Sequence, residues 1–134
     1  MPDISVTATA VIAGANAQIA QGIAGATITA GQVVYADLTA AGVLKLTDAD
    51  AAASAVACGI ALHAATAGQP LSYIYGGYLT MDGLTKGAVY AVSITAGGIA
   101  PVADPTTGDY MTVLGVAVSA TSLKLGINVS GVAI

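Results

Sequence analysis

The chain contains the stretch Gly31-Gln-Val-Val-Tyr35, followed by Gly42-Val-Leu-Lys-Leu46 and Gly59-Ile-Ala-Leu62. A second version follows as Gly87-Ala-Val-Tyr90, Gly98-Ile-Ala-Pro-Val102 and Gly115-Val-Ala-Val118. In both versions the last two glycines are 17 positions apart, but Tyr35 precedes Gly42 by seven positions and Tyr90 precedes Gly98 by eight. We interpret the two versions as copies of one β-unit that differ by one inserted residue.

The repeated positions are glycines and aliphatic residues, so the copies share a shape rather than a set of reactive groups. A solenoid needs at least three stacked repeats, so two copies favour closure into one compact body. Short segments rich in β-branched residues, separated by Gly-rich turns, are typical of strands in a barrel or sandwich. We expect strands in residues 4–12, 26–31, 32–38, 43–46, 56–63, 70–75, 78–81, 88–94, 99–102, 111–119 and 122–129.

Several local signals refine this pattern. Gly76-Gly77 is expected to end one strand, and Asp82-Gly83 is a hairpin signal. Thr47 to Asp50 could cap a short helix over residues 51–54. The spacing of Ile19 and Ile23 allows a helical turn, although the neighbouring glycines argue against a stable helix.

These observations predict an all-β fold, a single compact β-barrel or sandwich built from a duplicated β-unit. Residues 1–25 are interpreted as an extended N-terminal arm or outer strand, and residues 26–134 as the all-β domain. The sequence shows no linker that would divide this domain.

The composition favours association with other surfaces. Charged residues make up 7% of the chain, against about 25% in a typical soluble domain. Phe and Trp are absent, and the hydrophobic fraction of 56% consists mostly of small aliphatic side chains. A surface with so few charges leaves apolar area exposed on a lone subunit. We therefore expect a homo-oligomer that also docks on something larger.

Other partners are disfavoured. The longest weakly polar stretch, residues 51–62, is too short to span a bilayer, and the N-terminus has no basic region typical of a secretory signal. The net charge of −4 and three scattered lysines oppose direct nucleic-acid binding. The single cysteine, Cys58, excludes an internal disulfide framework.

The residues that could carry chemistry are few. His63 is the only histidine, so a histidine-based metal site has no second ligand of that type, and we expect His63 at the surface. Cys58 aligns with Leu114 of the second copy and is interpreted as a buried small hydrophobic residue. Asp48 and Asp50 lack the fuller calcium-loop pattern and fit turn chemistry better. We expect no catalytic residue, metal or cofactor.

The clearest aromatic feature is the cluster of Tyr73, Tyr75 and Tyr78. Tyr73 and Tyr75 are two positions apart, so they would point to the same face of a strand. Tyrosines in such an arrangement can anchor a protein interface or stack on sugars, and we favour the interface.

The ordered motifs resemble one protein family. They comprise the stretch from Ala24 to Tyr35, then Gly59-Ile-Ala-Leu62, Ala67-Gly-Gln-Pro70 and Gly87-Ala-Val-Tyr90. Together they resemble the capsid decoration, or cement, proteins of tailed bacteriophages over about residues 24–127. The resemblance implies a small all-β protein, made in the host cytoplasm, that binds the outer surface of the virion capsid. It would bridge major capsid subunits as a homotrimer or, alternatively, a dimer, without catalysis.

In that family N-terminal arms often reach neighbouring subunits. The expected interface residues are therefore those of the arm together with the tyrosine cluster: Ile4, Val6, Val11, Ile12, Tyr73, Tyr75 and Tyr78. This chain has no arginine, so its contacts would depend on the backbone and on apolar side chains rather than on salt bridges. Two alternatives stay open: a carbohydrate-binding module or tail-associated adhesin that uses the tyrosines, and a hydrolase fragment that uses His63.

Overall fold

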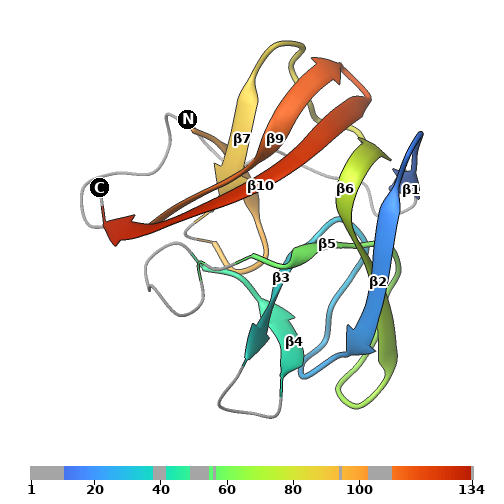
Figure 1. Cartoon of the computed structure of the whole chain (residues 1–134). Coiled ribbons are helices and arrows are strands. Elements are labelled where there is room, and N and C mark those ends of the chain that lie inside the picture. Colours follow the sequence, from blue (N-terminus) through green and yellow to red (C-terminus); the bar gives the residue numbers. More distant parts are fainter. Residues whose placement is uncertain are drawn as a thin grey trace.

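The computed structural model describes residues 11–37, 42–48, 55, 57–93, 95–102 and 110–133. Within these ranges the chain forms ten strands and no helix, so the all-β class is confirmed (Figure 1). The strands are β1 (Ile12–Ala13), β2 (Gln18–Ile23), β3 (Val33–Asp37), β4 (Val43–Leu46), β5 (Gly59–Ala61), β6 (Pro70–Thr80), β7 (Val89–Val92), β8 (Ile99–Pro101), β9 (Tyr110–Ser119) and β10 (Ser122–Ala133).

The strands form one curled antiparallel sheet with the order β4-β3-β5-β6-β10-β9-β7-β8, and β1 and β2 also pair with β6. This order reads the same from both ends if β3 corresponds to β7, β4 to β8, β5 to β9 and β6 to β10. In Figure 1 the strands β3, β4 and β5 form the lower part of the molecule, and β7, β9 and β10 form the upper part. This correspondence is compatible with two copies of a four-strand unit, and the duplication itself stays a prediction.

The long strand β6 holds the two parts together. Ile74 pairs with both Ile19 and Ile60, and Leu79 pairs with both Ala13 and Leu123. Because the two partners of a strand residue lie on opposite edges, β6 is an interior strand at both points. One edge carries β1 and β2, and the other carries β5 and then β10.

The expectation that Gly76-Gly77 ends a strand is wrong, because β6 runs through both glycines. Gln18 pairs with Gly76 and Ile19 pairs with Ile74, so Tyr75 is the extra residue of a β-bulge. Gly77 has a φ of +80°, and a Cβ there would overlap the backbone of Asn16. The glycines therefore let the strand bend without ending.

Other local expectations need correction. In the predicted strand at 26–31, only Ile28 forms a β-bridge, with Ala65, because the chain turns at Gly31, whose φ is +90°. Asp82-Gly83 does not close a hairpin, because β7 pairs with β8 and β9. Ile19 and Ile23 lie in strand β2. The possible helix over 51–54 lies outside the described residues.

Equivalent backbone hydrogen bonds occur in the two parts of the molecule at a constant offset of 56 positions. Gly31 N–H donates to the carbonyl of Ala61 at 2.8 Å, and Gly87 N–H donates to that of Ala117 at 2.7 Å. The ladders agree as well: Val33 pairs with Ile60 as Val89 does with Val116, and Val34 with Gly59 as Tyr90 does with Gly115. These pairs match Tyr90 with Val34 rather than with Tyr35, so the predicted duplication needs no inserted residue between Tyr90 and Gly98.

Two buried clusters stabilise the fold. The larger lies between the two parts and contains Ile60, Ile74, Leu79, Tyr90 and Leu123, among others. The smaller lies on the opposite face of the first part and contains Ala24, Ile28, Val34, Leu44, Ala61, Ala65 and Leu71. The sheet curls around this smaller cluster, because Ala24 bridges to Leu44 and Gly25 N–H donates to the carbonyl of Leu44 at 2.7 Å.

Part of the segment interpreted as an arm belongs to the sheet. β1 and β2 pair with β6, and Val11 and Ala24 are buried in the two clusters. Residues 11–25 are therefore tied to the body more firmly than the sequence suggested. Residues 1–10 lie outside the described residues, so an arm there stays a prediction.

Candidate interaction surface

The expected arm contacts divide between the core and the surface. Val11 is buried in the larger cluster, whereas Ile12 is 60% exposed. Ile12 pairs with Thr80, and Tyr78 lies two positions before Thr80, so Ile12 and Tyr78 point to the same face of the sheet. The structure thus brings together two of the seven expected contacts. Ile4 and Val6 lie outside the described residues.

The three tyrosines have different surroundings. Tyr73 packs against the smaller cluster, and Tyr75 at the bulge is 45% exposed. Tyr78 is half-buried, and its carbonyl accepts the N–H of Gly14 at 2.8 Å. Burial raises the pKa of the Tyr73 phenol, with smaller contributions from Cys58 and Tyr75. Tyr75 is therefore the most exposed of the three and the best placed for contact with a partner.

A continuous row of side chains crosses the face that Ile12 and Tyr78 share. Val89 pairs with Val116, Val116 with Lys124, and Lys124 with Tyr78. Paired residues in an antiparallel sheet point to the same face, so the row crosses β7, β9, β10 and β6. We call Val89, Val116 and Lys124, together with the neighbouring Val113 and Gly126, the open face.

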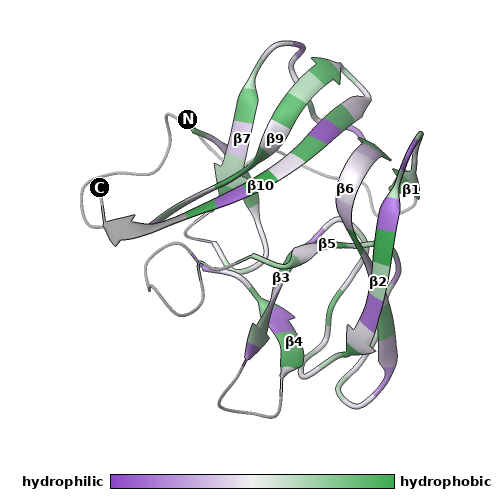
Figure 2. Cartoon of the chain, viewed as in Figure 1, coloured by the Kyte–Doolittle hydropathy of each residue, from purple (hydrophilic) through white to green (hydrophobic). Residues whose placement is uncertain are grey.

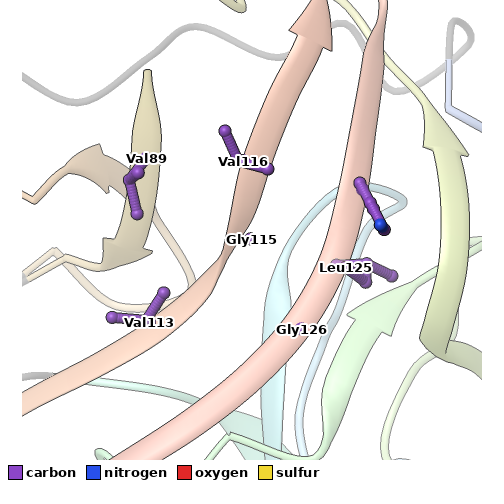
Figure 3. Close-up of a pocket in the computed structure, with 7 residues that line it drawn as sticks. Val89, Val113, Gly115, Val116, Leu125 and Gly126 are labelled. Atoms are coloured by element: carbon purple, nitrogen blue, oxygen red, sulfur yellow. The ribbon is translucent and has the colours of Figure 1, made fainter. Parts of the chain in front are cut away.

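The open face contains a shallow groove of about 300 Å³. Figure 3 shows Val113 and Val116 on β9 between Val89 and the β10 residues that line the groove. Val89 and Gly126 are exposed, and Val116 is half-buried. The strands here are largely hydrophobic, interrupted on β10 by a hydrophilic segment (Figure 2). Lys124, which is exposed, is the charged residue of the groove lining.

Sequence reasoning did not select the open face. Its aliphatic residues fall inside the second copy of the repeat, where they look like core positions. The available signal was the alternation along β10, in which Lys124 shares its phase with Ser122, Gly126 and Asn128, so the sequence marks this side of the strand as solvent-facing. A lysine stem there can still cover apolar surface while its ammonium stays in water.

The described ionisable groups do not converge on a catalytic centre. Lys45 Nζ lies 2.7 Å from Asp37 Oδ2 on the β3–β4 hairpin, and hydrogen bonding and charge attraction from Asp37 raise the pKa of Lys45. No group of three or more His, Cys, Asp or Glu residues that could hold a metal ion occurs in the described part of the chain. Cys58 is partly exposed rather than fully buried, which corrects the sequence-based interpretation.

His63 is exposed, as expected, and both of its ring nitrogens contact the backbone. Nε2 accepts the N–H of Ser72 at 3.0 Å, and Nδ1 lies 3.0 Å from the carbonyl of Ala64. This pattern fits the neutral tautomer with its proton on Nδ1. In this geometry the ring ties its own loop to strand β6, which favours a structural role.

Comparison with known proteins gives no family assignment, because no family model, curated protein or solved structure matches the chain. Among the described residues, none forms a helix with the length and apolar character needed to cross a bilayer.

Proposed function

We propose that this chain is a capsid decoration protein, which binds the outer surface of a tailed-phage head and stabilises it by bridging major capsid subunits. The observation that carries the proposal is the open face, where Val89 is exposed and Val113 and Val116 are half-buried on a sheet bearing few charges. Such a surface suits adhesion, because its burial against a protein is favourable at about 25 cal/mol per Å² of apolar area. The resemblance of the sequence motifs to cement proteins points to the same activity.

On a capsid with many identical sites, tight binding does not require a high affinity at each site. When one oligomer engages several neighbouring sites, the later contacts form at a high effective concentration, and avidity exceeds the affinity of each site. We therefore propose a homotrimer, with a dimer as the alternative, which bridges capsid subunits without catalysis or a cofactor.

The test uses expanded heads assembled from the major capsid protein encoded in the same genome. The purified chain is mixed with the heads at increasing concentrations, and binding is measured by co-sedimentation. Head stability is then followed by light scattering during heating. We expect saturable binding and a higher disruption temperature. Heads that gain no stability at saturating protein would refute the proposal.

One observation favours a second function. Tyr75 is 45% exposed at the bulge, and an exposed tyrosine ring can stack on a sugar. A glycan-binding module would give reproducible signals on a glycan array that Tyr75→Ala abolishes. The hydrolase alternative is less favoured, because both ring nitrogens of His63 contact the backbone. A hydrolytic activity that His63→Ala abolishes would restore it.

A further inference from the structure

The two copies of the repeat bury the same face to very different extents. The ladders match Val89 with Val33, Val116 with Ile60 and Lys124 with Ile74. We call Val33, Ile60 and Ile74 the covered row. Each residue of the covered row is fully buried, whereas Val89 is 37% exposed and Lys124 is exposed. One face thus forms core in the first copy and surface in the second.

The first copy shows what this face can accommodate. The covered row lies in the same cluster as Tyr90, Ala117 and Leu123. These residues are the ladder counterparts of Val34, Ala61 and Tyr73, and they form the opposite face of the second copy. The second copy therefore packs its opposite face, which is mainly aliphatic, onto the covered row of the first copy. This stacking leaves the open face at the end without a cover from the described residues.

Lys124 occupies the ladder position that Ile74 has in the first copy, and its charge indicates the chemistry of the partner surface. An aliphatic strip bearing one ammonium group is complemented by an aliphatic protein surface with a carboxylate opposite Lys124. A second copy of the open face does not satisfy this requirement, because the groove lining carries Lys124 and no carboxylate, so a symmetric contact would bring no counter-charge to either ammonium group.

We propose that the open face docks onto a protein partner whose own surface is aliphatic and carries an acidic side chain opposite Lys124. This inference rests on the proposed function, and the partner is accordingly the capsid subunit. It assigns the capsid contact to β7, β9 and β10 rather than to the arm or Tyr75.

The test measures binding to the same expanded heads for the full chain and for Lys124→Glu. Lys86→Glu is the matched control, because it makes the same charge change at an exposed residue outside the groove lining. A second pair compares Val116→Asp on the open face with Ile23→Asp, an exposed position on β2. Circular dichroism and thermal unfolding establish that each variant is folded.

We expect Lys124→Glu to weaken head binding by at least about tenfold and Lys86→Glu to change it by less than about twofold. Val116→Asp should weaken binding much more than Ile23→Asp. Equal binding by the unaltered chain and Lys124→Glu would overturn the inference and leave the proposed function intact. A change of oligomeric state in Lys124→Glu, with head binding retained, would show that a second copy covers the face and would also overturn it. If the unaltered chain does not bind heads, the proposed function fails, and this inference with it.

Discussion

Gly115 offers a sharp test of the packing in this sheet. An ideal Cβ at Gly115 would overlap the backbone carbonyl of Lys124 on the neighbouring strand. At the equivalent Gly59, a Cβ would overlap the carbonyl of Ile74 and lie 2.7 Å from Cδ2 of Tyr73. At both positions the glycine therefore permits close approach of the next strand, and neither glycine has a positive φ.

We predict that Gly115→Ala destabilises the fold by about 1–3 kcal/mol, the usual cost of overpacking. The obstacle is backbone, so no side-chain rotation relieves it, and β9 and β10 must separate locally. Alanine also restricts the unfolded chain, which returns about 0.4–1 kcal/mol, so the net loss falls in the lower part of that range. For a domain of this size, a loss of 1–2 kcal/mol lowers Tm by roughly 3–10 °C.

The assay is urea and thermal unfolding followed by circular dichroism, with Gly126→Ala as the matched control. Gly126 lies on the adjacent strand with no positive φ, and a Cβ there meets no atom within 4 Å. Gly126→Ala is expected to be neutral or slightly stabilising. Gly59→Ala should behave like Gly115→Ala. If Gly115→Ala proves as stable as Gly126→Ala, close strand approach does not explain the repeated glycine.

Three further predictions concern polar groups. Thr112→Val should cost about 0.5–1.5 kcal/mol in urea unfolding, because its buried hydroxyl donates to the carbonyl of Ala55, which would keep only the N–H of Ala57 as a donor; an unchanged midpoint would contradict this. The raised pKa values of Lys45 and Tyr73 mean that the folded state holds both protons more tightly than the unfolded state. Their stabilisation is therefore complete below about pH 10 and lost as the pH rises further; equal stability at pH 9 and pH 11.5 would refute it, and Tyr73→Phe should reduce the loss. Asp37→Asn should return the pKa of Lys45 toward its ordinary value, as measured by NMR titration of the lysine side chain; an unchanged titration would contradict the ion pair.

The sequence predicted the strands better than their connections. Alternating and β-branched segments located β3, β4 and β7–β10 to within a few residues, because strand formation there depends on local pattern. The bulge at Tyr75 and the pairing of β2 with β6 were missed. Both depend on contacts between residues far apart in the chain, such as Asn16 with Gly77. A pair of glycines reads as a turn unless the neighbouring strand is known.

The interaction surface was harder to predict for a related reason. Val33 and Val89 follow glycine by the same two positions in the two copies, yet one is fully buried and the other is 37% exposed. Local pattern assigns both to an apolar face and cannot tell which face will be covered. Which of the two faces is covered depends on how the two parts of the molecule pack together. In this packing the face with Val33 is covered and the face with Val89 is left at the surface. Lys124 keeps that terminal face hydrated in the free protein while its stem still covers apolar surface. Lys124, one of three lysines in a chain without arginine, therefore occupies the ladder position equivalent to Ile74, on the face that we propose as the partner contact.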